Sequence, residues 1–251
     1  MHQAPAHQNW FDQGGAAYAR FRPEYPPQLA EFLATLAPPR ALAVDVGCGN
    51  GQLTAQLATH FEQVLGVDPS ADQIANAQAH ERVRYACAAA EHLPVEDGGV
   101  GLLTAAQAAH WFDLPAFYAE ARRVGRSDMA IALISYGVLR LEAPLQARFE
   151  RFYRDEIGPF WPPERQLVDD GYRGIDFPFH EQAAPAIEIR KEWHLAQLLG
   201  YISTWSAIRK ARDAGRADLL TAFADEFSAL WDDAGARKSV SWPINMRIGR
   251  L

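Results

Sequence analysis

The stretch that decides the fold runs from a buried strand into a glycine-rich turn: Val44-Asp45-Val46-Gly47-Cys48-Gly49-Asn50-Gly51. Residues 41–46 form an apolar run that ends in glycines, which is typical of a strand in a parallel sheet. After the turn, Leu53, Leu57 and Phe61 recur four residues apart and predict one face of a helix. A G-x-G-x-G turn between a strand and a helix lets the backbone come close to a ligand at the carboxyl end of the strand. The alternative is an ordinary turn rich in glycine.

The same turn excludes two kinds of phosphate site. A dinucleotide fingerprint, G-x-G-x-x-G, needs its third glycine where Gln52 stands, and a P-loop needs a lysine that is absent here. Asp68 lies 21 residues after Gly47, at the end of the next predicted strand. An acid there can accept both hydroxyls of a ribose, or it can supply negative charge to a helix start beside Ser70. A ribose acceptor without a phosphate cradle favours S-adenosylmethionine over NAD.

The first half of the chain continues to alternate strands with helices. Short apolar runs predict strands at 64–67, 83–87, 100–105 and 129–135. Ser70 and Gln73 form a capping box, and Asp113 can cap a helix that begins after it. This alternation predicts an α/β fold: a doubly wound, mostly parallel, seven-stranded Rossmann-like sheet with helices on both faces.

The pattern changes from Leu141 onward and predicts a helical cover inserted late in the sheet order. Helical periods cover 145–157, 195 to about 212, and about 216–233, whereas alternation at 187–193 and 239–250 indicates strands. Because no Pro/Gly/Ser linker separates the halves, we expect one domain over 1–251. Its expected parts are an N-terminal helical segment at 1–40, a cofactor-binding core at 41–136, the cover with one strand at 141–235 and a final strand at 236–251.

Composition narrows the function classes. Lysine and arginine number 24 against 31 acidic residues, a net charge of −7 that argues against a nucleic-acid partner. The longest strongly apolar stretch, 129–141, is too short to span a bilayer. Two cysteines make no disulfide framework and no zinc site, so no metal is expected. The first ten residues resemble no signal peptide, and we expect a cytoplasmic protein, monomeric or homodimeric.

Several short motifs follow one another along the chain. They are Tyr18-x-x-x-Arg22-Pro23-x-Tyr25-Pro26, the turn at 44–51, Gly66-Val67-Asp68-Pro69-Ser70, Ala90-Glu91-His92-Leu93-Pro94, residues 105–112 ending in His110-Trp111-Phe112, Thr204-Trp205-Ser206-Ala207 and Trp242-Pro243. In this order they resemble the class I S-adenosylmethionine-dependent methyltransferases, most of all the small-molecule branch called type 11, which includes relatives of trans-aconitate methyltransferase. The resemblance covers nearly the whole chain.

The resemblance implies a role for each motif. The cofactor-binding residues it implies are Tyr18, Arg22, Gly47, Cys48, Gly49, Gly51, Gln52, Asp68, Pro69, Ser70, Ala90, Glu91 and Gln107. It implies that Gln107, His110 and Trp111, which follow the fourth strand, are catalytic residues facing the methyl group. It also implies that Trp161, Tyr201 and Trp205 of the cover contact the substrate. Alternative roles stay open for four of these residues. Tyr18 and Arg22 can belong to a helix that only packs on the sheet, Trp111 can be a core residue, and His110 can be a hydrogen-bonded side chain without a catalytic role.

The methyl acceptor is expected to be a small molecule with an oxygen nucleophile. A carboxylate needs no general base, whereas a phenol or alcohol does, and His110 is then the candidate. The chain lacks Asn/Asp-Pro-Pro-Tyr/Phe, the motif that grips an amino group in methyltransferases of adenine or glutamine. Arginines of the cover, such as Arg148, Arg151 and Arg209, suit a small acid or a phenol.

Two other functions stay open, a nicotinamide-dependent oxidoreductase and a non-catalytic S-adenosylmethionine-binding protein. The chain also departs from the family twice. Gly101 stands where relatives carry an acid in the fourth strand, and Arg126-Ser127-Asp128 stands where they often carry Pro-Gly-Gly. Both positions have structural roles in the family, so the departures affect where the fourth and fifth strands are expected to begin more than they affect the expected activity.

Overall fold

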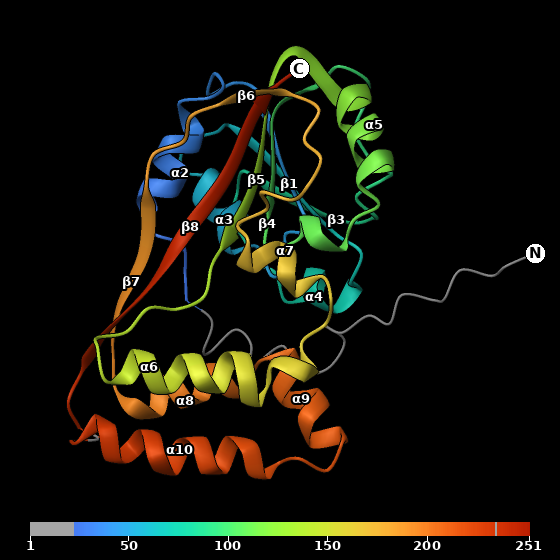
Figure 1. The fold of residues 1–251 in the computed structure, drawn as a ribbon. Coiled ribbons are helices and arrows are strands. Elements are labelled where there is room, and N and C mark those ends of the chain that lie inside the picture. The colour runs from blue at the N-terminus through green and yellow to red at the C-terminus, as the bar shows by residue number, and fades with distance from the viewer. Residues whose placement is uncertain (1–22, 234) are drawn as a thin grey trace, which may run out of the picture.

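The computed structural model describes residues 23–233 and 235–251. Its sheet has eight strands in the order β3-β2-β1-β4-β5-β8-β6, and β7 also pairs with β8 (Figure 1). The strands are β1 Leu42–Val46, β2 Gln63–Asp68, β3 Val83–Cys87, β4 Val100–Ala106, β5 Gly125–Tyr136, β6 His180–Gln182, β7 Ile187–Trp193 and β8 Lys238–Arg250. Strands β1 to β5 pair in parallel, and β8 is antiparallel to β5, β6 and β7. The predicted α/β class is confirmed, with the three-residue β6 as one strand beyond the seven expected.

Most of the helices lie in three places around this sheet. They are α2 Pro27–Ala34, α3 Gln52–Leu57, α4 Ala71–Ala75, α5 Leu114–Val124, α6 Leu145–Arg151, α7 Arg165–Asp169, α8 Leu195–Ser203, α9 Ser206–Asp213 and α10 Asp218–Trp231. Short turns, η1 Ala109–Trp111, η2 Phe152–Glu156 and η3 Gly158–Phe160, link them. Helices α2 and α3 cover one face, α5 covers the other, and α6, α8, α9 and α10 gather beyond the edge where the parallel strands end (Figure 1).

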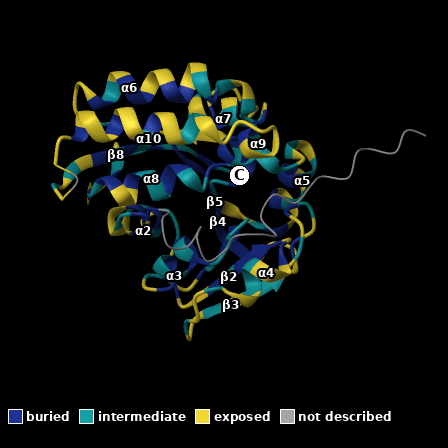
Figure 2. Cartoon of the chain, turned by 90° about the horizontal axis from the view of Figure 1, so that it is seen from below, coloured by how far each residue is buried: buried dark blue, intermediate teal, exposed yellow. Residues whose placement is uncertain are grey.

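The alternation of side chains along β5 explains the two faces. Ala130, Ala132 and Ile134 join one apolar cluster with α2, α3 and the cover, whereas Ile131 and Leu133 join the cluster under α5. Both sets are fully buried, as a strand in the middle of a two-sided sheet requires. In the cover, α6 and α10 each carry both buried and exposed residues, as expected for helices with one face on the core (Figure 2).

Local chemistry sets the helix starts as the sequence predicts. The Ser70 hydroxyl accepts the Gln73 N–H at 3.3 Å, and Asp113 accepts the Ala116 N–H at 3.3 Å. The structure also explains why position 101 is a glycine: a Cβ there would lie 2.5 Å from the Ala41 Cβ. The glycine therefore lets the chain before β1 pack tightly on β4.

Three predictions about the second half need correction. The helix expected from 195 to about 212 is two helices, because Trp205 adopts an extended conformation and the Thr204 hydroxyl bonds the Tyr201 carbonyl. The helix expected at 145–157 is α-helical only to Arg151 and continues as a π-turn. Helix α7 and strand β6 were not predicted at all. The expectation of one domain over 1–251, with the four parts named above, stays a prediction.

Candidate active site

The strand order reverses between β1 and β4, which places the ligand crevice of a doubly wound sheet outside their carboxyl ends. The loops that follow these two strands touch, since a Cβ on Gly47 would lie 2.4 Å from the Ala108 Cβ. The amides of Gly47 and Cys48 donate to the Val67 carbonyl at 2.7 and 3.0 Å. The glycine turn is thereby fixed between the ends of β2 and β4.

All three glycines of the turn have left-handed backbones, with φ of +67° at Gly47, +55° at Gly49 and +84° at Gly51. Their surroundings differ. A Cβ on Gly51 would lie 2.1 Å from the Tyr85 hydroxyl, so this glycine permits close packing. Among residues 23–233 and 235–251, a Cβ on Gly49 would meet only the Gln73 side chain, at 3.8 Å. Within this part of the chain, Gly49 thus presents bare backbone, as close approach of a ligand requires.

Asp68 lies opposite this bare backbone. One carboxylate oxygen accepts the Gly49 N–H and the other accepts the Ser70 N–H, both at 2.9 Å. Burial raises the pKa of Asp68, and the hydrogen bonds from Ser70 and Gly49 oppose that rise. Because a carboxylate offers about four lone-pair directions, about two remain for a ligand diol. The geometry fits the ribose of the expected cofactor while also serving the start of α4.

Asp45 is a buried acid beneath the turn that was not predicted as a site residue. Its two oxygens accept hydroxyl protons from Thr54 at 2.7 Å and Thr104 at 2.8 Å. Burial raises its pKa to about 6, against the lowering effect of these hydrogen bonds. The available signal was an acid inside an apolar strand. Asp45 ties α3 to β4 and holds the floor of the turn.

The remaining predicted cofactor residues surround the turn. Gln52 begins α3, and Cys48 lies partly buried with its thiol 3.5 Å from the Gly49 carbonyl. Burial, with Asp45 and Asp68 nearby, raises the pKa of the Cys48 thiol, which therefore stays protonated. At the end of β3, the Cys87 thiol lies 3.3 Å from the Pro69 carbonyl.

The turn after β3 supplies the last two predicted cofactor residues. Ala90 is buried, and Glu91 accepts the Asp113 N–H at 3.0 Å, which docks this turn on the start of α5. Tyr18 and Arg22 lie outside the residues that the structure describes. Their predicted place over the cofactor stays a prediction.

The loop after β4 carries the three predicted catalytic residues. Gln107 has φ of +56°, an uncommon conformation for a residue with a side chain, and its amide donates to the Tyr136 carbonyl at 3.1 Å. His110 lies in η1, with its ring 4.8 Å from that of Trp111. His110 Nδ1 lies 2.8 Å from the hydroxyl of Tyr172, which is fully buried and has φ of +62°. Tyr172 was not predicted as a site residue.

The surroundings of His110 decide its protonation. Burial, with the charge of Arg165 as a second cause, lowers the pKa of His110 to about 3. Burial raises the pKa of Tyr172, whose oxygen faces the backbone amides of His110 and Ala109. The imidazole is therefore neutral at neutral pH. Donation of the Tyr172 hydroxyl proton to Nδ1 would leave the imidazole proton on Nε2.

The three predicted substrate residues come together in the cover. Trp205 packs against Trp161 and Tyr201, with ring centroids 5.4 and 5.5 Å apart, and against Tyr153 at 5.6 Å. The Trp242 indole donates to the Tyr201 hydroxyl at 3.2 Å. These four residues, Tyr153, Trp161, Tyr201 and Trp205, form an aromatic cluster in the cover, and the contact of the last three with substrate stays a prediction.

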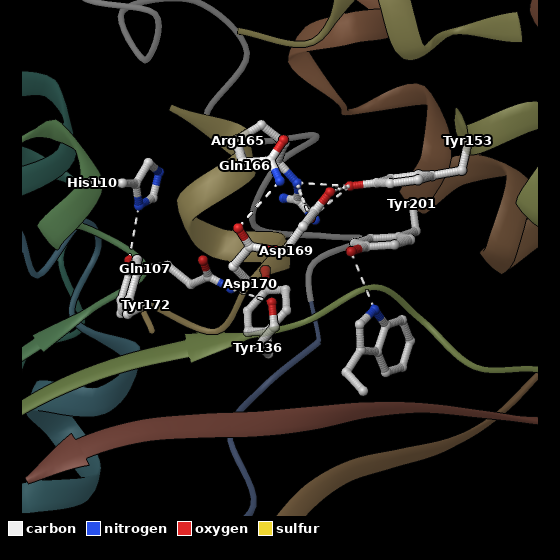
Figure 3. A network of polar contacts seen from close by, with 11 residues as sticks. Gln107, His110, Tyr136, Tyr153, Arg165, Gln166, Asp169, Asp170, Tyr172 and Tyr201 are labelled. Carbon is white, nitrogen blue, oxygen red and sulfur yellow. Dashed lines mark hydrogen bonds and ion pairs between the residues drawn. The ribbon is translucent and has the colours of Figure 1, made fainter. Parts of the chain in front are cut away.

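Arg165 of α7 lies between His110 of the β4 loop and the tyrosines of the cover (Figure 3). Its Nε donates to the Tyr153 hydroxyl at 2.8 Å and to Asp169 at 2.9 Å, and its guanidinium lies 4.9 Å from the centre of the Trp161 ring. Helix α7 is too short for a periodic signal, so sequence reasoning missed it. By contrast, Arg148 and Arg151 pair with Glu226 and hold α6 on α10.

Over 23–233 and 235–251, no helix is long and apolar enough to cross a bilayer. Within the same ranges, no three His, Cys, Asp or Glu side chains form a group suited to a metal ion.

Comparison with known proteins identifies the family. The model of the methyltransferase domain family matches residues 44–133. A Dictyostelium discoideum protein named as a methyltransferase is 37% identical over 208 residues, which cover 81% of this chain and 79% of that protein. A trans-aconitate 2-methyltransferase of Deinococcus radiodurans is 50% identical, but over only 21% of this chain and 22% of its own length.

A solved structure agrees with these sequence matches. It is named as a type II methyltransferase from Anaeromyxobacter dehalogenans and is 43% identical, with a TM-score of 0.85 over 92% of this chain and 98% of its own. The bare glycine backbone, the half-engaged Asp68 and the lack of a phosphate-binding lysine fit the same cofactor. The chain belongs to the S-adenosylmethionine-dependent methyltransferases, with S-adenosylmethionine as its cofactor.

Proposed function

We propose that the chain methylates an oxygen atom of a small-molecule acceptor at the crevice outside β1 and β4. The observation that carries the proposal is the contact between the loops after these strands, where a Gly47 Cβ would lie 2.4 Å from Ala108. This contact puts the bare backbone of Gly49 beside the loop of Gln107, His110 and Trp111. Cofactor and acceptor groups therefore meet at one mouth.

The cofactor side of the proposal assigns a part of the molecule to each loop. Asp68 would accept the ribose hydroxyls, and the turn at 47–52 would line the methionine and ribose parts. Pro69 and Ser70 would lie beside the ribose, while Ala90 and Glu91 after β3 would border the adenine. Support comes from the register, since Val46 pairs with Val67 and Asp68 pairs with Cys87, so these loops leave adjacent strands at one edge.

The acceptor side needs orientation more than it needs acid–base chemistry. S-adenosylmethionine, when bound, supplies a methyl group already activated on a sulfonium sulfur. The residues of the chain have to hold an acceptor oxygen in line with that group, and such orientation can contribute about 7–11 kcal/mol to lowering a barrier. Gln107, fixed by the Tyr136 carbonyl, and Trp111, packed on His110, limit where the acceptor can lie.

The protonation of His110 favours a carboxylate acceptor. An imidazole whose pKa is lowered to about 3 is a poor proton acceptor at neutral pH. Its Nε2–H can instead donate a hydrogen bond to an oxygen that is already negative. A phenol is the second candidate, because the aromatic cluster of the cover would pack on its ring.

The test offers the purified chain S-adenosylmethionine with matched sets of small carboxylic acids and phenols and measures release of the demethylated cofactor. We expect turnover with members of the acid set, and His110→Asn should slow it without weakening cofactor binding. Calorimetry that detects no binding of S-adenosylmethionine would overturn the cofactor assignments. Turnover on amines alone would overturn the assignment of oxygen.

We further propose a setting for this activity: one domain, monomeric or homodimeric, in the cytoplasm. Cys48 and Cys87 are both free, which suits a reducing compartment. The net charge of −7 suits a small-molecule partner better than a nucleic acid.

A further inference from the structure

Arg165 is held firmly but uses only part of its hydrogen-bonding capacity. Its side chain is 19% exposed, and Nε alone donates to described groups, the Tyr153 hydroxyl and Asp169. Tyr153 in turn bonds both carboxylate oxygens of Asp169 at 2.9 Å. A guanidinium has five N–H donors, and the four on the two Nη atoms form no hydrogen bond with any residue at 23–233 or 235–251. The cation is therefore preorganised with its outer fork unused.

Trp161 carries a second donor without a partner among the described residues, on a ring that the Arg165 guanidinium covers. This donor is the indole nitrogen, which is buried. The Arg165 guanidinium lies 4.9 Å from the centre of the same ring. A buried donor without a partner is rare in native proteins and calls for an explanation, such as a bound group.

The two donors lie within the candidate acceptor site. The charge of Arg165 acts on His110 and Tyr172 on one side and on Tyr153 and Tyr201 on the other. In Figure 3, Arg165 stands between His110 of the β4 loop and the tyrosines of the cover. A ligand that reaches from the β4 loop into the aromatic cluster would therefore pass Arg165.

We propose that Arg165 and Trp161 form a binding site for an anionic group of the methyl acceptor. The outer guanidinium fork suits a carboxylate or phosphate, which it can bind through two parallel N–H bonds, and the Trp161 N–H supplies a third donor. Asp169 and Tyr153 position the arginine through Nε and leave the fork open. The proposal rests on the proposed function, because it assigns a ligand to the acceptor side of that site.

The test follows the indole N–H resonance of Trp161 by NMR. The protein is labelled with ¹⁵N-tryptophan and saturated with S-adenosylhomocysteine. The chain has seven tryptophans, so Trp161→Phe identifies the resonance by its loss while keeping an aromatic ring at this position. The probes are cinnamate, its neutral amide cinnamamide, and phenyl phosphate. We expect cinnamate or phenyl phosphate to move the Trp161 resonance in a saturable way and cinnamamide to leave it in place.

Variants of the arginine complete the test. Arg165→Gln should weaken binding of the active anion about tenfold or more, as expected for loss of a charge-assisted bidentate contact. Arg173→Gln is the matched control, because Arg173 is exposed in the same segment and donates only to the Asp170 carbonyl. Arg165→Lys keeps the charge without the fork and serves if the glutamine variant does not fold.

The outcomes separate the inference from the proposed function. A response to cinnamate alone identifies a carboxylate, and a response to phenyl phosphate alone identifies a phosphate; both support the site. No response to either anion, or unchanged affinity in Arg165→Gln, overturns it. If neutral acceptors are methylated as well as acids, the anion site is wrong while the methyltransferase assignment stands. If the anion binds at Trp161 but no acceptor is ever methylated, the proposed function is wrong while the site stands.

Discussion

Among single residues, Asp68 combines two tasks on one carboxylate. It fixes the turn through the amides of Gly49 and Ser70 and keeps acceptor capacity for a ligand. We predict that Asp68→Ala weakens binding of S-adenosylmethionine by about 1–3 kcal/mol, because ribose hydroxyls lose their partner. Calorimetry measures the change, with Asp72→Ala on the exposed side of α4 as the control. An affinity equal to that of the wild type would remove Asp68 from the ribose site.

His110 gives a second prediction at this scale, about pH. Since its pKa is lowered to about 3, it stays neutral throughout the range from pH 6 to 9. We therefore expect a methyl-transfer rate that is flat over this range, in the wild type and in His110→Asn alike. Steady-state rates under saturating cofactor measure it. A wild-type rate that rises through a pKa near 6.5, and loses that rise in the variant, would show a general base and favour a hydroxyl acceptor.

Among the structural elements, the turn between β1 and α3 depends on glycine for two distinct reasons. Gly51 makes room for Tyr85, whereas Gly49 leaves room for a ligand. We predict that Gly49→Val abolishes cofactor binding while the chain still folds. The left-handed backbone, with φ of +55°, makes a side chain cost about 1–2 kcal/mol there, but the space around it is open.

Circular dichroism and calorimetry together check this prediction, with Gly174→Ala, also in open space, as the control. A Gly49→Val variant that folds and binds S-adenosylmethionine normally would exclude the turn from the site.

The break between α8 and α9 places Trp205 at the centre of the aromatic cluster. Its ring contacts Phe149, Tyr153, Trp161 and Tyr201, all residues of the cover. We predict that Trp205→Ala leaves cofactor affinity nearly unchanged but lowers kcat/KM for the acceptor, because the proposed role of this ring is to contact the acceptor and not the cofactor. Removal of so large a buried ring also costs about 3–5 kcal/mol of stability.

The control for the cover is Trp231→Ala, which removes an equally buried ring from α10. Equal loss of activity in both variants would show a general effect of stability, and the map of the acceptor pocket would then be wrong.

The elements also show what a sequence pattern can predict. Strands β1 to β4 and helix α5 were predicted almost residue by residue, since apolar runs and the Asp113 cap act locally. Strand β5 was predicted at 129–135 but begins at Gly125, because its polar start, Arg126-Ser127-Asp128, carries no apolar signal. Helix α7 has five residues and β6 has three, too few for a period to show. The site divides in the same way. The motif residues of the candidate site could be picked out from the sequence, and their roles stay predictions. Arg165 and Tyr172 come close to His110 only through tertiary packing, and no local pattern marks them.

In the molecule as a whole, two buried groups make opposite contributions to stability in acid. The pKa of His110 is lowered from 6.5, so the unfolded chain takes up a proton first and stability falls as the pH drops below about 6.5. The pKa of Asp45 is raised from 3.8 to about 6, so the folded chain keeps its proton longer. Stability from Asp45 therefore falls as the pH rises from about 4 to about 6. The two effects partly offset each other in the wild type.

Replacing one of the two groups should make the pH dependence due to the other measurable. Asn at position 45 mimics the protonated acid, since it can still accept from one threonine and donate to the other. We predict that the free energy of unfolding of Asp45→Asn, relative to the wild type, increases by about 1–3 kcal/mol between pH 4 and pH 7. Urea unfolding at unit steps of pH measures the difference, and Asp72→Asn is the exposed control. In His110→Asn the relative stability should change in the opposite sense, becoming less favourable as the pH rises from 4 to 7. A constant difference across this range would mean that Asp45 ionises normally in the folded chain, with water reaching the floor of the glycine turn.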